Sequence, residues 1–276
     1  MSPLACPVCH APLAEVANGY TCPAGHHFDR ARQGYTNLLT RAAGQHGDNR
    51  EMLLGRRAFL EGGSYTPLRD ALVSEMSVRL PQNALFLDAG CGEGYYGDAV
   101  LRARTDLHGY GIDISRDALK LAGSRETVRA GRFSLFVSGV YEMPFLDGRF
   151  DGVLNVFAPL AVSEYRRVLK PGGYLFLVIP GENHLYEMKE VLYDTPRKNE
   201  VSDFALPSFA LLSGTPLTYS FRLEGQESIS ALFSMTPYYY RTPEGGKARL
   251  AALDALDLTA DFHLLTYRAE ENRARS

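Results

Sequence analysis

The sequence predicts an α/β fold with a doubly wound, mostly parallel sheet, preceded by a small metal-binding module at the N-terminus. From residue 84 onward, short apolar runs of strand length alternate with helical patterns. A glycine-rich loop directly follows the first of these runs, the position at which such sheets bind a ligand. Three of the four cysteines of the 276-residue chain lie within its first 22 residues.

The N-terminal cysteines have the spacing of a zinc site. Cys6 and Cys9 form a C-x2-C pair, and Cys22 follows after twelve intervening residues, with His26 and His27 close behind it. Three thiolates and an imidazole suit tetrahedral zinc. A segment this short cannot bury enough apolar surface to fold alone, and metal binding supplies the missing free energy.

Two other interpretations of these cysteines are a redox C-x-x-C pair and three cysteines without a common role. A redox pair normally begins a helix, whereas Pro7, Pro12 and Gly19 indicate turns in this segment. Spacing alone leaves the fourth zinc ligand open between His26 and His27, because adjacent side chains of an extended segment point in opposite directions.

A helical segment separates the metal module from the α/β pattern. Residues 40–49 are polar and contain glycine, which indicates a loop or hinge. A helix is expected over residues 52–60, and a second from Pro67 to Leu80 has apolar residues at every fourth position. We therefore divide the chain into a metal module (1–40), a helical connector (41–83) and an α/β domain (84–276).

The α/β domain is expected to contain continuous apolar strands between helices, the pattern of a parallel sheet covered on both faces. Right-handed crossovers then give a doubly wound sheet. The expected strands are 84–88, 108–113, 133–138, 152–157 and 174–179, with helices near 95–104, 116–123 and 160–169. A closing β–α–β unit is expected from 216–222, helices near 226–235 and 246–256, and 260–267.

The glycine loop favours S-adenosylmethionine over a dinucleotide. It reads Asp88-Ala-Gly90-Cys91-Gly92-Glu93-Gly94-Tyr95, whereas a dinucleotide fingerprint is GxGxxG with a helix N-terminus facing pyrophosphate. The carboxylate of Glu93 is expected to repel phosphate. S-adenosylmethionine carries a sulfonium, an amino-acid head and a ribose diol, and it has no phosphate.

Other strand ends supply further candidate cofactor contacts. Asp113 ends the second strand, where a carboxylate can accept both ribose hydroxyls; its alternative role is a helix cap or turn residue. Gly139 and Val140 follow the third strand, where an adenine edge would be read. Asp88 is expected chiefly to hold the loop, and Cys91 is expected to be a small loop residue and not a nucleophile.

The fourth strand ends beside the expected methyl donor. Asn155 and Phe157 at this strand end are candidates for framing a planar acceptor, although Phe157 has an equal alternative as a core residue.

Taken together, these motifs resemble the bacterial 23S ribosomal RNA (guanine-N1)-methyltransferases of the RlmA type. The likeness runs from residue 6 to about residue 241 and includes CPVC, CPAGHHFDRARQGYTNLL, LDAGCGEGYYG, FAPLAVSEYRRVLKPGGYLFLVIPGENHLYEMK and MTPYYYR. The resemblance implies a class I S-adenosylmethionine-dependent methyltransferase with a seven-stranded sheet and a zinc module used in RNA recognition. It also implies methylation of one of two neighbouring guanines in a 23S rRNA hairpin, and a homodimer.

The resemblance also assigns residues. The implied zinc ligands are Cys6, Cys9, Cys22 and His26. The implied cofactor contacts Tyr65, Glu93, Gly94 and His184 join those argued above, so the expected set is Tyr65, Asp88, Gly90, Glu93, Gly94, Tyr95, Asp113, Gly139, Val140 and His184. Asn155 is the candidate for contacting the guanine edge, and Glu182 is a weaker candidate for accepting the guanine proton.

The charge distribution agrees with an RNA partner better than the net charge does. The chain has 29 basic and 32 acidic residues, a net charge of −3, yet residues 30–70 hold seven arginines against four acids. No apolar run approaches the roughly 20 residues that cross a bilayer, so we expect a cytoplasmic protein without a membrane segment. The alternatives are a small-molecule methyltransferase with a structural zinc module, and a non-catalytic module that binds cofactor or RNA.

Overall fold

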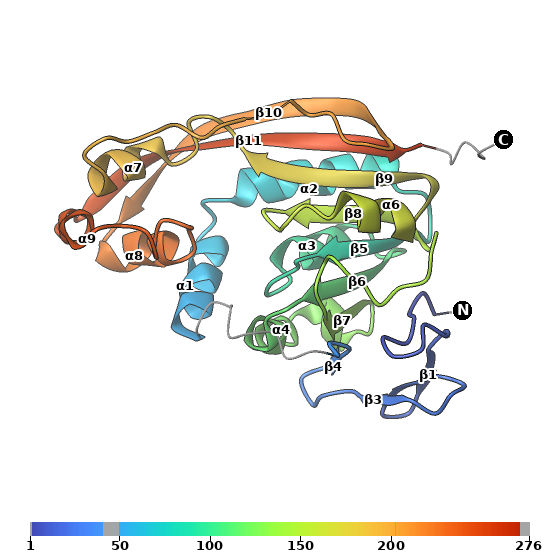
Figure 1. Cartoon of the computed structure of the whole chain (residues 1–276). Helices are drawn as coiled ribbons and strands as arrows, with labels where there is room; N and C mark the ends of the chain where they lie inside the picture. The colour runs from blue at the N-terminus through green and yellow to red at the C-terminus, as the bar shows by residue number, and fades with distance from the viewer. Residues whose placement is uncertain (1, 41–49, 202, 271–276) are drawn as a thin grey trace.

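The computed structural model describes residues 2–40, 50–201 and 203–270. It contains a three-stranded N-terminal sheet and a large eight-stranded sheet flanked by helices (Figure 1). The loop predicted at residues 40–49 lies outside the described residues, apart from Thr40.

The N-terminal module is a small antiparallel sheet with two tight turns beside it. Strands β1 (Ala14–Val16), β2 (Gly19–Thr21) and β3 (His27–Asp29) pair in that order. Gly25 has φ +83° and donates its N–H to the carbonyl of Cys22 at 2.9 Å, which closes one of the turns. The other turn is closed by the N–H of His10, which donates to the carbonyl of Cys6 at 2.8 Å.

The module is packed onto the α/β domain. Strand β4 (Tyr35–Asn37) pairs parallel to β7 (Phe133–Val137) and adds an eighth strand to the seven that were expected. The ring of Tyr20 lies 5.5 Å from that of Phe136, and the N–H of Ala5 donates to the carbonyl of Pro144 at 2.9 Å. Buried residues of the module therefore belong to a core cluster that continues into the large sheet.

Two helices follow the module and pack against the α/β domain. Helix α1 (Arg50–Glu61) contacts α8 (Gln226–Ser234). Helix α2 (Thr66–Arg79) contacts α3 (Tyr95–Ala103) and buries the apolar residues that the sequence placed at every fourth position, Leu68, Leu72 and Met76. Both helices lie where the sequence predicted them.

The large sheet has the order β10-β11-β9-β8-β5-β6-β7-β4. Of its strands, β11 alone runs antiparallel to its neighbours, so the sheet is mostly parallel, as predicted. The strands not yet given are β5 (Leu85–Ala89), β6 (His108–Asp113), β8 (Phe150–Val156), β9 (Leu169–Pro180), β10 (Phe209–Glu224) and β11 (Ala255–Ala269), and the short helices beside them are α4 (Arg116–Ala122), α5 (Glu126–Arg129) and α6 (Val162–Val168).

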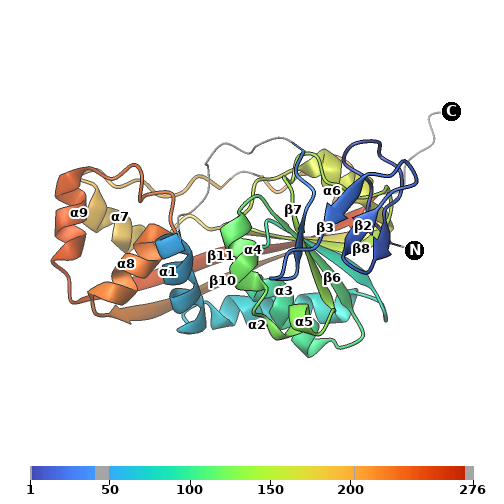
Figure 2. The ribbon, with the colours of Figure 1, turned by 90° about the horizontal axis from the view of Figure 1, so that it is seen from below.

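The two C-terminal strands are longer than the sequence predicted. Strands β10 and β11 extend past the other strands and carry a lobe of α7 (Tyr186–Leu192), α8 and α9 (Glu244–Ala251), at the opposite end of the sheet from the N-terminal module (Figure 1 and Figure 2). None of the helices in the described ranges is long and apolar enough to cross a bilayer.

The strand order places a crevice at the carboxyl edge of the sheet. The chain runs from β5 through β6 to β7 in one direction and from β8 to β9 in the other, so β5 and β8 flank the point at which the order reverses. Open α/β sheets bind ligands at this switch point, outside the carboxyl ends of the strands.

Candidate functional site

A cavity of about 790 Å³ lies at the carboxyl edge of the sheet. This volume is within the range of cofactor and ligand pockets. Its walls come from the loops after β5, β6, β7, β8 and β9, and from the ends of α1 and α8. Of the ten predicted cofactor residues, nine line it, namely Tyr65, Asp88, Gly90, Glu93, Tyr95, Asp113, Gly139, Val140 and His184; Gly94 instead forms the N-cap of α3.

The glycine loop is shaped by backbone conformations that favour glycine. Gly90 has φ +80°, and a Cβ atom there would lie 2.4 Å from the Cβ of Ala158. Gly92 has φ +54° and open space around its Cα, which leaves room for a ligand to approach the backbone. The N–H groups of Gly90 and Cys91 both donate to the carbonyl of Ile112 at 2.9 Å, so the loop is fixed to the end of β6.

The carboxylate of Asp113 is oriented toward the loop and the cavity. Its Oδ2 accepts the N–H of Gly92 at 2.9 Å, and its Oδ1 accepts the N–H of Ser115 at 2.8 Å. A carboxylate can accept about four hydrogen bonds, so these contacts are compatible with acceptance from a ribose diol. Gly139, at the end of the adjacent β7, has nothing within 4 Å of a built Cβ, which suits close approach of a planar ring.

Asp88 is one of two deeply buried acids of the cavity, with Glu93. It is 3% exposed, and its Oδ2 has no hydrogen-bond partner among the described residues. Burial raises the pKa of this carboxyl to about 7, despite a hydrogen bond from the N–H of Gly97, and the nearby Asp113 adds to the increase. The buried carboxyl of Asp88 is therefore better suited to face a cationic group of a ligand than an anionic one.

Tyr65 and His184 form a hydrogen-bonded pair on the other side of the cavity. The Nε2 of His184 lies 3.3 Å from the Oη of Tyr65, and the N–H of Asp261 donates to its Nδ1 at 3.3 Å. Burial lowers the pKa of His184 to about 4, so the ring is neutral. Because Nδ1 accepts, the single ring proton lies on Nε2 and is donated to Tyr65, whose own O–H then remains to donate elsewhere.

The four predicted metal ligands lie together in the N-terminal module. The ligand atoms of Cys6, Cys9, Cys22 and His26 are all within 4.8 Å of one another. The Nδ1 of His26 lies 3.5 Å and 3.3 Å from the sulfurs of Cys6 and Cys22, and the sulfurs of Cys9 and Cys22 are 3.6 Å apart. Tetrahedral zinc, with Zn–S distances of about 2.3 Å and a Zn–N distance of about 2.0 Å, places its ligand atoms about 3.5–3.8 Å from one another.

The geometry also decides between the adjacent histidines. His27 lies in β3 and points away from the sulfurs, with its Nε2 3.1 Å from the Oδ1 of Asp29. His26 is therefore the fourth ligand, and the cluster fits a structural zinc ion.

Comparison with known proteins agrees with this combination of a zinc cluster and a cofactor cavity. A family model for the RlmA N-terminal region matches residues 4–41, and a methyltransferase domain model matches residues 86–173. The chain is 35% identical to a Micromonospora griseorubida protein assigned to the 23S rRNA (guanine-N1)-methyltransferases, over 96% of this chain and 97% of the relative. The chain belongs to the RlmA family of 23S rRNA (guanine-N1)-methyltransferases.

A second relative agrees with this membership, and a solved structure agrees with the fold. A Streptomyces fradiae protein named 23S rRNA (guanine(748)-N(1))-methyltransferase is 31% identical, with 92% of this chain and 91% of that protein covered. A Bacillus halodurans structure described as a methyltransferase superposes with a TM-score of 0.50 at 22% identity, covering 72% of this chain and 99% of that one. The second comparison bears on the fold alone.

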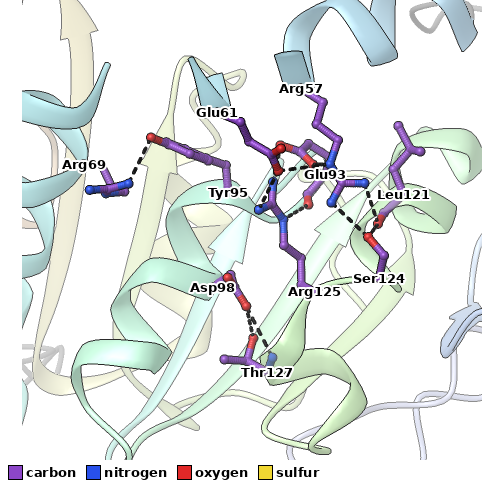
Figure 3. A network of polar contacts seen from close by, with 10 residues as sticks. All are labelled: Arg57, Glu61, Arg69, Glu93, Tyr95, Asp98, Leu121, Ser124, Arg125 and Thr127. Atoms are coloured by element: carbon purple, nitrogen blue, oxygen red, sulfur yellow. Dashed lines mark hydrogen bonds and ion pairs between the residues drawn. The ribbon is translucent and has the colours of Figure 1, made fainter. Parts of the chain in front are cut away.

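Within this RlmA-family site, Glu93 is held by two arginines (Figure 3). Its buried carboxylate lies 2.5 Å from the guanidinium of Arg125 and 3.2 Å from that of Arg57 on α1. Burial raises the pKa of Glu93, and the two arginines act against this increase. The expectation that Glu93 repels phosphate therefore needs correction, because two cations compensate its charge.

Arg57 and Arg125 are themselves fixed by neighbouring residues. Glu61 pairs with both arginines, at 3.2 Å and 3.3 Å, and Arg57 donates to the Oγ of Ser124 at 2.9 Å (Figure 3). The ring of Tyr95 lies between the guanidinium groups of Arg69 and Arg125, each 5.8 Å from its centroid. Helix α1 is thus tied to the glycine loop by charge pairs.

Asn155 does not line the cavity. It is fully buried, and its Nδ2 donates to the Oη of Tyr165 at 2.6 Å and to the carbonyl of Pro159 at 3.2 Å, while its Oδ1 accepts the N–H of Ala158 at 3.2 Å. These contacts favour a positioning role for the loop after β8 over contact with a guanine. Phe157, by contrast, is 45% exposed and lines the cavity, so its alternative as a core residue is wrong.

Sequence reasoning missed three residues of this site. Arg57 and Arg125 hold Glu93 from positions more than 30 residues away in the chain, and no local pattern joins them. Tyr96, next to the predicted Tyr95, also lines the cavity, and its Oη has no hydrogen-bond partner among the described residues. The available signal was the helix predicted from residue 95, because two successive residues of a helix point in different directions, and so Tyr95 and Tyr96 do not make the same contacts.

Proposed function

We propose that this protein transfers a methyl group from S-adenosylmethionine to N1 of a guanine in a hairpin of 23S rRNA. The relatives described above carry this activity in their names. The observation in the structure that best supports it is the length of the cavity, which extends from the end of β7 at Gly139 to the end of β9 at His184. With strands about 4.8 Å apart, four strand spacings give roughly 19 Å, room for an extended cofactor and a planar base.

The residues divide this length into two parts. The adenosine part of the cofactor suits the ends of β7 and β6, which carry Gly139, Val140 and Asp113. The glycine loop after β5 suits the rest of the cofactor. The end of β8, with Phe157, is then left for the methyl acceptor, next to His184 at the end of β9, a predicted cofactor contact.

Phe157 has the properties of a stacking surface for a base. It has φ +57°, a conformation that strains a non-glycine residue by about 1–3 kcal/mol and that is enriched at functional sites. Its ring is within 21° of parallel to that of His184, with centroids 6.3 Å apart. Enzymes that modify a base within a folded strand flip it out of its stack and hold it between aromatic or apolar side chains. Tyr141 and Leu160 are further exposed residues of the same cavity.

The cofactor supplies the activated methyl group, and the protein supplies alignment. Guanine N1 carries a proton in the neutral base, so this proton must leave before or during methyl transfer. Among the described residues, the carboxylates that line the cavity are Asp88, Glu93 and Asp113, all on the cofactor side. Glu182 is exposed and paired with Lys198 at 3.2 Å. Orientation of N1, with proton release to solvent, is therefore the main contribution.

The RNA is expected to dock between the zinc module and the catalytic domain. Among the arginines of residues 30–70 that the structure describes, Arg30 pairs with Glu15, Arg57 with Glu93, and Arg69 with Asp70. The exposed Arg32 and Arg50 are the better candidates for phosphate contacts. An enzyme that acts on ribosomal RNA is expected in the cytoplasm, and the homodimer implied by the resemblance stays a prediction.

Transfer of label from the cofactor to RNA tests this proposal. The full-length protein is incubated with methyl-labelled S-adenosylmethionine and a transcript of the 23S hairpin, with a transcript lacking the target guanines as the control. We expect label in the first transcript alone. Label in a small metabolite and never in RNA would replace the proposal by a small-molecule methyltransferase, and binding without transfer would indicate a non-catalytic module.

A further inference from the structure

A lysine is buried behind the acceptor end of the cavity. Lys189 lies in α7 and is 7% exposed. Its Nζ donates to the carbonyl of Arg197 at 2.9 Å and to the Oδ1 of Asn199 at 2.6 Å. The same atom lies 5.4 Å from the centre of the Tyr238 ring. Asn199 and Tyr238 both line the cavity, so the ammonium lies directly behind two side chains of the cavity wall.

None of the ion pairs in the described part of the chain includes Lys189. Its partners are a carbonyl, an amide oxygen and a ring, all of them uncharged, since burial raises the pKa of Tyr238 to about 12. Burial also lowers the pKa of Lys189, as expected for an ammonium removed from water without an anion beside it. Buried charges in proteins are normally paired, so this one is available to attract an anion in the cavity.

The other charged groups around Lys189 are engaged elsewhere. Glu187 of the same helix accepts from the N–H and the hydroxyl of Thr259. Asp261 of β11 accepts from a hydroxyl and a backbone N–H. On the segments around α7 the exposed charged residues are Glu190, Arg197, Glu200 and Arg241. The others form pairs, Lys198 with Glu182, Arg249 with Asp194, and Lys247 with Glu244.

Charge is thus divided along the cavity. The carboxylates of Asp88, Glu93 and Asp113 lie on the cofactor side, where the methyl donor brings a positive charge. Lys189 lies at the other end, close to His184. Burial is the main cause of the lowered pKa of His184, and the charge of Lys189 contributes in the same direction, so the two groups are near enough to interact. A guanine that has lost its N1 proton is an anion, and a cation at this end suits it.

We propose that the ammonium of Lys189 stabilises the anion that guanine forms when N1 loses its proton, acting across Asn199 and Tyr238 as a positioning residue that does not touch the base. This inference rests on the proposed function for the identity of the acceptor. The N1–H bond breaks, the proton passes to solvent, and the electron pair stays on the base, shared between N1 and O6. That pair then forms the bond from N1 to the methyl carbon as the methyl–sulfur bond breaks, and sulfur keeps the electrons of the broken bond.

The pH dependence of methyl transfer tests this role in the full-length protein. A unit charge about 9 Å from the base changes the ionisation equilibrium by about 10- to 30-fold at an effective dielectric constant of about 20. For Lys189→Met we expect a single-turnover rate lower by this factor near pH 7, and a rate that approaches the wild type at high pH, where guanine ionises unaided. Lys189→Arg keeps the charge and is expected to retain most of the rate. Lys247→Met removes an exposed lysine of the neighbouring α9 and is the matched control.

Binding of RNA without cofactor gives a second readout. In one hairpin the target guanine is replaced by 8-azaguanine, which has nearly the same shape and a more acidic N1–H. At pH 8 we expect the wild type to bind this hairpin about tenfold more tightly than the guanine hairpin, and Lys189→Met to lose the preference. Lys189→Gln is uncharged but still donates a hydrogen bond, and it is expected to behave like Lys189→Met, which keeps the test decisive if Lys189→Met fails to fold.

The outcomes separate an electrostatic role from a structural one. A loss of rate that is equal at every pH, the same loss in Lys189→Arg as in Lys189→Met, or an unchanged preference for 8-azaguanine in the uncharged variants would overturn the inference. Failure of the wild type to methylate the guanine hairpin at any pH would instead contradict the proposed function.

Discussion

The Nε2 of His184 lies 3.3 Å from the phenol oxygen of Tyr65, although the two residues are 119 positions apart. Tyr65 precedes α2, and His184 follows β9, so the contact joins the helical segment to the far side of the sheet. The N–H of Asp261 on β11 fixes the ring from its other side. This arrangement makes Tyr65 a hydrogen-bond donor toward the cavity.

Removing the phenol hydroxyl tests this arrangement. For Tyr65→Phe we expect about tenfold weaker binding of S-adenosylhomocysteine by calorimetry, because a donor in the cavity is lost and the Nε2–H of His184 is left without an acceptor. Binding that equals the wild type would show that the pair has only a structural role. Tyr174→Phe, outside the cavity lining, is the control for loss of a hydroxyl.

Exchange of single zinc ligands tests the metal cluster. Cys22→Ser and His26→Ala are expected to lose zinc and to lower the Tm of the whole protein, because the module shares a core with the α/β domain. His27→Ala, which alters an exposed side chain, is the control and keeps its zinc. Metal content is measured by atomic emission. Full zinc content in Cys22→Ser would contradict the ligand set.

Substitution of a loop glycine tests the shape of the cofactor site. In Gly90→Ala the new Cβ would meet the Cβ of Ala158 at 2.4 Å, so the loop must shift, and we expect at least about tenfold weaker cofactor binding. Gly148→Ala, at a position that also has a positive φ (+62°), would meet nothing within 4 Å of its Cβ. We expect backbone strain to lower the free energy of unfolding of both variants by about 1–2 kcal/mol, which urea unfolding would measure. Only Gly90→Ala is expected to lose affinity for the cofactor.

The charge network around Glu93 contributes to stability. In Arg125→Ala a buried carboxylate loses its nearest cation, and we expect the free energy of unfolding to fall by about 3 kcal/mol. The double variant Arg125→Ala/Glu93→Gln is expected to recover part of this loss. Arg222→Ala breaks the exposed ion pairs with Glu224 and Asp257 and is expected to change stability by less than about 1 kcal/mol. Similar losses in the two single variants would show that burial of Glu93 is unimportant.

The raised pKa of Asp88 makes stability depend on pH. The folded protein holds this proton up to about pH 7, whereas the unfolded chain releases it near pH 3.8, so the folded state binds more protons between these values. Stabilisation from this group is therefore present at low pH and is lost as pH rises toward 7. The difference in unfolding free energy between wild type and Asp88→Asn, without cofactor, is expected to fall from pH 5 to pH 7 and then level off. A difference that stays constant from pH 5 to pH 8 would contradict the buried state of Asp88.

Local sequence patterns predicted the parts of this protein that depend on neighbouring residues. The cysteine spacing, the strand–loop–helix around Gly90 and the acid at the end of β6 are each encoded within a few residues. The pairing of β4 with β7 was not predictable in this way, because it depends on how the module packs against Phe136. The clamp of Arg57 and Arg125 on Glu93 joins three distant segments, and only the folded chain brings them together.

Identification of the modified nucleoside tests the central claim most directly. After reaction with the 23S hairpin, the RNA is digested to nucleosides and separated by liquid chromatography with mass spectrometry, and primer extension locates the modified position. The account predicts 1-methylguanosine and a block to extension at a single guanine, because N1 lies on the pairing edge of the base. A methyl group on another atom of guanine, on another base, or on no RNA nucleoside would contradict it.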